Sequence, residues 1–148
     1  MGKVIVIVGG QWGDEGKGSV VDLLANRADV VCRYAGGNNA GHTVVVGKIK
    51  YKFHMLPAGI IHEDKVNVLG NGMVIDPAVL VEEIQNIKKQ GFPVSEKNLV
   101  ISSHAHVITP EAVKEDEATG KKIGTTARGI GPTYAAKITR VGKRMEDF

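Results

Sequence analysis

Residues 9–18 read GGQWGDEGKG and follow directly on the apolar run VIVIV at residues 4–8. The pattern predicts a buried strand that ends in a glycine-rich turn, with a helix beginning just after the turn. Glycines allow positive φ angles and bring backbone N–H groups close to an anion, and the positive end of the helix dipole adds to that attraction. We therefore expect a phosphate to bind here, with the chemistry centred on Asp14, Glu15 and Lys17.

This turn matches neither generic nucleotide-binding pattern. In the phosphate-loop pattern G-x-x-x-x-G-K-[ST], Gln11 stands at the first glycine and Gly18 at the hydroxyl position, and the glycines carry the dinucleotide spacing in reverse order. A tight strand-to-helix connection without a ligand is the alternative. Two acids beside a lysine favour the ligand, because a phosphate and a divalent metal need both signs of charge close together.

The composition is that of one soluble globular domain. The chain has 148 residues, of which 43% are hydrophobic and 24% charged. No window approaches the ~20 apolar residues of a membrane span, and the amino terminus lacks an export signal, so we expect a cytoplasmic protein. The single cysteine, Cys32, lies in an apolar run and is expected to be buried. A net charge of only +3 and 5% aromatic residues argue against nucleic-acid binding.

Strand-like runs at residues 4–8, 30–32, 66–69 and 99–102 alternate with helix-like or turn-rich segments. This alternation predicts an α/β fold with a mostly parallel central sheet flanked by helices. Two further runs, at residues 44–46 and 49–53, flank Gly47-Lys48 and predict a β-hairpin added to the sheet edge.

The clearest helix follows Asp76, with Pro77 at its first position and Gly91 as its stop. Its residues divide into an apolar face, Leu80, Ile84 and Ile87, and polar residues that lie elsewhere on the helix, Glu82, Glu83 and Lys88. The apolar face is expected to pack on the sheet.

A second glycine-rich stretch, AGGNNAGHT at residues 35–43, also follows an apolar run. Loops that leave the carboxyl ends of neighbouring parallel strands share one crevice, so this stretch is expected to face the first. His42 can exchange a proton near neutral pH, although a lone histidine is more often structural. Asn38 and Asn39 are turn residues by default, and read a base edge only if a ligand binds.

A third stretch, IGTTARGIGPTY at residues 123–134, holds too many glycines for a regular element and predicts a shaped loop. Its hydroxyls, backbone N–H groups and Arg128 suit a phosphate, and Arg140 follows in a basic segment expected to be helical. The alternative is a flexible solvent loop.

Together these strings resemble the adenylosuccinate synthetase family. Residues 9–18, 39–43 and 124–132 carry its signatures in the family's order, and LGNGMVIDP at residues 69–77 extends the match. The resemblance covers essentially the whole chain, 1–148, as one nucleotide-binding segment. Family members run to several hundred residues, so it implies a P-loop-NTPase-like fold that is incomplete and corresponds to the amino-terminal third to half of the family's chain.

The resemblance implies a GDP-forming ligase of AMP (purine) biosynthesis that joins IMP and L-aspartate, with GTP as co-substrate and 6-phosphoryl-IMP as intermediate. By the same resemblance Asp14 is the general base at N1 of IMP and binds Mg²⁺ together with the carbonyl of Gly41. His42 is then the general acid at the 6-oxygen and the transferring phosphoryl group, and Lys17 holds phosphates.

The resemblance also implies a homodimer in which Arg140 reaches the IMP site of the neighbouring subunit. The substrate- and nucleotide-binding residues that it implies are Gly13, Asp14, Glu15, Gly16, Lys17, Gly18, Ser19, Asn39, Ala40, Gly41, His42, Thr43, Thr126 and Arg140.

The sequence departs from the family at Ser19, where many members have a second lysine, at Ala127, where glycine is usual, and in a shortened region before Ile123. The residues that recognise guanine and aspartate are expected beyond Phe148, which leaves turnover by this polypeptide alone open. Two other functions stay open as well: a non-catalytic purine-nucleotide-binding module and a generic P-loop GTP hydrolase.

Overall fold

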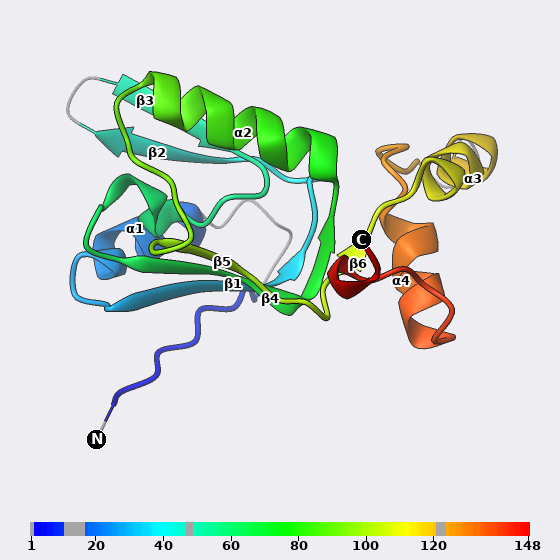
Figure 1. Ribbon diagram of the computed structural model, residues 1–148, viewed down its shortest axis with the longest axis horizontal. Coiled ribbons are helices and arrows are strands. Elements are labelled where there is room, and N and C mark those ends of the chain that lie inside the picture. The colour runs from blue at the N-terminus through cyan, green and yellow to red at the C-terminus, as the bar shows by residue number, and fades with distance from the viewer. Residues whose placement is uncertain (1, 11–16, 47–48, 121–123) are drawn as a thin grey trace.

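A computed structural model of the chain describes residues 2–10, 17–46, 49–120 and 124–148. The predicted α/β class with a parallel sheet is confirmed (Figure 1). The central strand is β4 (Val66–Ile75), which pairs in parallel with β1 (Val30–Gly36) and, on its other side, with β5 (Leu99–Ile101). The short strand β6 (His106–Val107) pairs in parallel with the last two residues of β4.

Helix α2 (Pro77–Lys89) is the predicted helix, and its ends are those that the sequence indicates. The Asp76 carboxylate accepts hydrogen bonds from the backbone N–H groups of Ala78 and Val79, at 3.0 and 3.2 Å. Just beyond the helix, Gly91 has a φ of +94°, which favours glycine. The remaining helices are α1 (Lys17–Ala25), α3 (Pro110–Gly120), α4 (Ile130–Ile138) and the short 3₁₀ segments η1 (Ala58–Ile61) and η2 (Met145–Asp147).

The predicted hairpin is present, but its predicted position at the edge of the parallel sheet is wrong. Strands β2 (His42–Val46) and β3 (Ile49–Phe53) pair with each other in a separate two-stranded antiparallel sheet. Tyr51 and Phe53 are buried in one core cluster with Leu69 of β4 and Leu80 of α2. The hairpin therefore lies with α2 on one side of the parallel sheet, because its alternating apolar side chains are buried there (Figure 1).

Two predictions about β-strand residues are wrong. Residues 2–10 form no strand, and Val4, Val6 and Val8 are 67 to 85% exposed. A strand needs a neighbour for its N–H and C=O groups, and none of the described strands pairs with this segment. Cys32 is exposed rather than buried, because its side chain in β1 lies between buried Val31 and half-buried Arg33 and points away from the core.

The third glycine-rich stretch is a loop only up to Gly129, so the prediction for its second half is wrong. Helix α4 begins at Ile130 and includes Pro132 in its first turn, where the missing N–H of proline costs nothing. The helix ends at Ile138, which leaves Arg140 beyond it, in a left-handed conformation with φ +63°. Arg140 is therefore not helical. No helix in the described ranges is long and apolar enough to cross a membrane.

Candidate functional site

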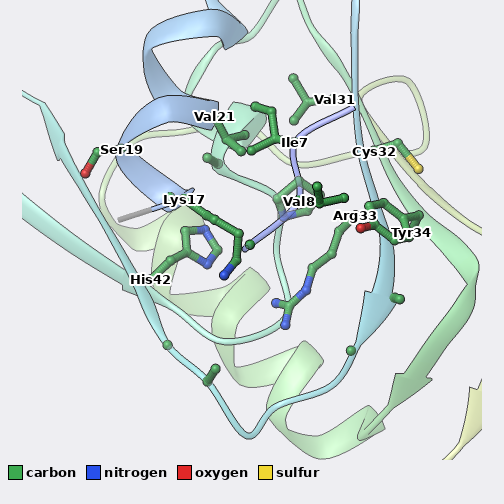
Figure 2. Close-up of a pocket in the computed structure, with 18 of the residues that line it drawn as sticks. Ile7, Val8, Lys17, Ser19, Val21, Val31, Cys32, Arg33, Tyr34 and His42 are labelled. Atoms are coloured by element: carbon green, nitrogen blue, oxygen red, sulfur yellow. The ribbon is translucent and has the colours of Figure 1, made fainter. Parts of the chain in front are cut away.

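A cavity of about 770 Å³ opens between the start of α1, the strand β1 and the loop that leads into β2 (Figure 2). Parts of the chain that are distant in sequence meet around it. Its lining consists of Ile7, Val8, Gly9, Lys17, Gly18, Ser19, Val21, Val31, Cys32, Arg33, Tyr34, Ala35, Gly36, Ala40, Gly41, His42, Thr43, Pro57 and Ala58.

The first turn of α1 lies directly against the start of β2. A side chain at Gly18 would put its Cβ atom 3.1 Å from the Cβ atom of His42, so the close approach depends on glycine. Figure 2 shows the side chains of Lys17 and His42 pointing into the same part of the cavity. The structure thus brings together the lysine of the first glycine-rich stretch and the histidine of the second.

His42 is held in its neutral form at neutral pH. Burial, followed by the positive charge of Arg33, lowers the pKa of the imidazole from 6.5 to about 4, although Glu83 acts in the opposite direction. Its Nε2 atom is buried and has no hydrogen-bond partner among the residues that the structure describes. A ring nitrogen of a neutral imidazole inside a cavity is available to a bound ligand.

The lowered pKa of His42 predicts that acid destabilises the fold through this residue. The unfolded chain binds the proton at higher pH than the folded chain, so this contribution to stability is fully present above pH 6.5 and is lost as the pH falls toward 4. We expect the urea midpoint of the unmodified chain to fall more between pH 7 and pH 4 than that of His42→Asn. His104→Asn, at an exposed histidine, serves as the control. Equal pH dependence in the unmodified chain and His42→Asn would contradict the prediction.

Arg33 is a cavity residue that the sequence did not single out. Its guanidinium donates to the backbone carbonyl of Gly37, at 2.7 Å, and to the carbonyl of His54. Figure 2 shows the side chain reaching from β1 into the cavity. Burial lowers the pKa of the guanidinium, against the negative charge of Glu83, but arginine still carries its charge at neutral pH. The sequence feature that could have indicated Arg33 is its position, as a charged residue directly after the apolar run 30–32.

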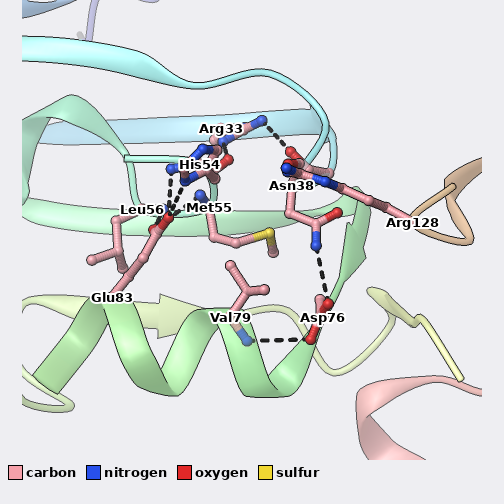
Figure 3. Close-up of polar contacts among 10 residues, drawn as sticks. Arg33, Asn38, His54, Met55, Leu56, Asp76, Val79, Glu83 and Arg128 are labelled. Carbon is pink, nitrogen blue, oxygen red and sulfur yellow. Dashed lines mark hydrogen bonds and ion pairs between the residues drawn. The ribbon is translucent and has the colours of Figure 1, made fainter. Parts of the chain in front are cut away.

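Glu83 lies in the interior, contrary to the prediction that placed it away from the apolar face of α2. The residue is 8% exposed. Its carboxylate accepts hydrogen bonds from the backbone N–H groups of Met55 and Leu56, both at 3.0 Å, and from that of His54 (Figure 3). The His54 ring nitrogen Nδ1 lies 3.2 Å from the same carboxylate. Three consecutive backbone donors explain why a carboxylate is buried on this helix.

The sequence-predicted site residues divide into three groups. Gly13, Asp14, Glu15 and Gly16 lie outside the described residues. The structure places Lys17, Gly18, Ser19, Ala40, Gly41, His42 and Thr43 around the cavity. Asn39, Thr126 and Arg140 are exposed and do not line it. The described residues contain no cluster of three or more His, Cys, Asp or Glu side chains that could hold a metal ion.

Comparison with known proteins gives one consistent result. The sequence model of a protein family described as adenylosuccinate synthetase matches residues 6–148. An adenylosuccinate synthetase from Pelotomaculum thermopropionicum is 56% identical over 99% of this chain, and one from Caldanaerobacter subterraneus is 53% identical over the same share. The chain spans only 35% of the length of these two relatives.

A solved structure agrees with the sequence comparisons. The structure of a fully ligated adenylosuccinate synthetase from Plasmodium falciparum superposes with a TM-score of 0.81 and 41% sequence identity. The match covers 91% of this chain and 32% of that one.

Proposed function

We propose, on the premise that the chain belongs to the adenylosuccinate synthetase family, that it forms the phosphoryl-transfer part of a GDP-forming ligase. This enzyme joins IMP and L-aspartate at the expense of GTP, in purine biosynthesis. The observation that carries the proposal is the meeting of Lys17 and Gly18 with His42 at one cavity. Phosphoryl transfer depends chiefly on placing charged groups around the reacting phosphate, and this arrangement supplies such groups.

The first step of the proposed reaction makes the 6-oxygen of IMP a nucleophile. Asp14, which lies outside the described residues, takes the proton from N1, and the 6-oxygen attacks the γ-phosphorus of GTP. The bond from that phosphorus to the β,γ-bridging oxygen breaks and GDP leaves. In the second step the amine of L-aspartate displaces the phosphate from C6. Lys17 and the backbone N–H groups around Gly18 hold the phosphates while charge moves between them.

The proposed role of His42 has to agree with its low pKa. With a pKa of about 4 the free site holds a neutral imidazole, which donates one hydrogen bond to the 6-oxygen but is not yet an acid. A bound triphosphate places negative charge beside the ring, which favours the protonated form and raises the pKa. His42 therefore becomes a general acid only when the nucleotide is present.

Magnesium is the metal that the family pattern implies. Its proposed ligands, the Asp14 carboxylate and the Gly41 carbonyl, are oxygen donors of the kind that Mg²⁺ prefers, so the residues fit the ion. A Cβ atom at Gly41 would lie 3.1 Å from Lys52 Cε and 3.3 Å from His54 Nε2, so this glycine keeps the backbone close to both side chains. When bound, the ion neutralises charge on the transferring phosphate.

The proposed assembly is a cytoplasmic homodimer. Arg140 is exposed just beyond the end of α4 and does not line its own cavity, a position that suits an arginine donated to a neighbouring subunit. A guanidinium binds a 5′-phosphate through two parallel hydrogen bonds, which suits the phosphate of IMP.

A phosphate-release assay on the full-length protein tests the function. Release is expected only when GTP, IMP and L-aspartate are all present, because the phosphate first goes to IMP and leaves only when the amine attacks. GTP hydrolysis without IMP would instead indicate a P-loop hydrolase. IMP binding without turnover would indicate a purine-nucleotide-binding module. The chain of 148 residues, assayed in parallel, shows whether this segment releases phosphate by itself.

A further inference from the structure

Asn38 lies buried where three separate segments of the chain meet. The residue is 2% exposed, and its side-chain Nδ2 donates to the Asp76 Oδ2 atom at 3.0 Å (Figure 3). Asp76 lies between the last residue of β4 and the first residue of α2, whereas Asn38 belongs to the glycine-rich loop before β2. The hydrogen bond thus joins two loops that are 38 residues apart in the chain.

The two oxygens of the Asp76 carboxylate accept hydrogen bonds from different segments. Oδ1 caps α2 by accepting from the Ala78 and Val79 N–H groups, and Oδ2 accepts from Asn38. This fixes the orientation of the Asn38 amide, because the flipped amide would turn its oxygen toward the carboxylate. The amide oxygen, Oδ1, is buried and finds no partner within the described part of the chain.

The backbone of Asn38 makes a second connection, to the third glycine-rich stretch. Its carbonyl accepts a hydrogen bond from the Arg128 guanidinium (Figure 3). The stretch is itself anchored at the next residue, because the Gly129 N–H donates to the buried Asp116 carboxylate at 2.8 Å. Asn38 therefore connects loop 37–41 to the start of α2 through its side chain and to loop 124–129 through its backbone.

Close packing leaves this junction little freedom to adjust. A Cβ atom at Gly37 would lie 2.9 Å from Val74 Cγ2 and 3.2 Å from Ile130 Cδ1, so the loop runs directly against β4 and the first residue of α4. Asn39, which follows Asn38, and Thr126, two residues before Arg128, are both exposed, one on each of the two connected loops. The hydrogen bond from Arg128 to Asn38 joins the two loops that carry these side chains.

We propose that Asn38 and Asp76 form a positioning pair, which holds Asn39 and Thr126 at the spacing that a purine nucleoside monophosphate requires. This inference rests on the proposed function, in which those two exposed residues bind IMP. Neither Asn38 nor Asp76 contacts the nucleotide. The pair acts first on the IMP loops, because neither residue lines the cavity at Lys17 and His42. Ala40 and Gly41 of the same loop do line it, so a smaller effect on triphosphate binding is expected than on IMP binding.

The test compares IMP and GTP affinities in the full-length protein carrying Asn38→Ala or Asp76→Ser. Serine caps a helix as well as aspartate does but is too short to reach Asn38, so the second variant removes the pair and keeps α2 intact. Each variant is expected to weaken IMP binding by roughly tenfold, the effect of losing one hydrogen bond to a charged group, and to change the GTP dissociation constant less than about twofold. The double variant is expected to be no weaker than either single one.

Asn71→Ala is the matched control, because Asn71 is an exposed asparagine on β4. Unchanged IMP affinity in both test variants would overturn the inference, and so would equal losses for IMP and GTP, which indicate a general loss of structure. Hydrogen exchange provides a measurement that needs no ligand: backbone amides in residues 37–41 and 124–129 should exchange faster in both variants than in the control. If the unmodified protein binds no IMP, the proposed function fails, and unchanged exchange would show separately that the pair does not connect the loops.

Discussion

Replacing His42 with asparagine is expected to slow phosphoryl transfer from GTP to IMP by about 10²- to 10⁴-fold in the full-length protein, the usual contribution of a positioned acid or base. Asparagine keeps a hydrogen-bond donor of similar reach but cannot gain a proton when the triphosphate binds. The ring lies at the start of β2, next to the first turn of α1, so its loss removes the only described histidine that lines the cavity. IMP and GTP affinities are expected to change far less than the rate.

Positional isotope exchange within GTP measures this first step separately from the attack of aspartate. The unmodified protein should move label from the β,γ-bridging position only when IMP is present, and His42→Asn should lose most of that exchange. His104→Asn, at an exposed histidine that does not line the cavity, should retain it. Near-normal exchange in His42→Asn would remove His42 from the phosphoryl-transfer step and leave it a structural residue.

The parts of the fold that the sequence predicts well are those fixed by local chemistry. Helix α2 has a capping aspartate, a proline at its first position and a glycine after its end, and all three act within a few residues of the helix ends. The segment 4–8 is as apolar as the other strands, yet a strand also requires a neighbouring edge, which no local pattern specifies. The predictions for Cys32 and for the position of the hairpin are wrong for the same reason. Local sequence does not specify how the strands and helices pack, and this packing decides which face of a strand is covered.

The sequence predicted the site residues that belong to the glycine-rich stretches or lie directly beside them. It did not predict those that lie within a strand or a helix. Lys17 and His42 line one cavity, as we expected, although residues 4–8, which precede the first glycine-rich stretch, form no strand of the parallel sheet. Arg33 belongs to a strand and Glu83 to a helix, and periodicity alone places a charged residue on the solvent side of either. The burial of Glu83 depends on three backbone N–H groups of residues 54–56, which no pattern within α2 reveals.

Replacing Glu83 with leucine is expected to destabilise the chain by about 3–5 kcal/mol, because it leaves three backbone donors without their acceptor at roughly 1–3 kcal/mol each, partly offset by local adjustment. Met55 and Leu56 are fully buried, so water cannot replace the carboxylate there without opening the core. Glu83→Gln retains one acceptor oxygen and should cost less than the leucine variant. Glu82→Leu, at the exposed neighbouring position, is the matched control and should stay within about 0.5 kcal/mol of the unmodified chain.

The loss at Glu83 should also reach the cavity, because the residue acts on His54, whose carbonyl accepts from Arg33. If the turn at residues 54–56 shifts, the Arg33 guanidinium loses one of its two backbone acceptors, and its other contact, with Gly37, holds the glycine-rich loop before His42. Urea unfolding gives the stability of each variant, and GTP affinity at a temperature where Glu83→Gln remains folded reports on the cavity. If the free energy of unfolding of the leucine variant lies within about 1 kcal/mol of that of the unmodified chain, the hydrogen bonds from these backbone groups to the carboxylate do not stabilise the fold as proposed.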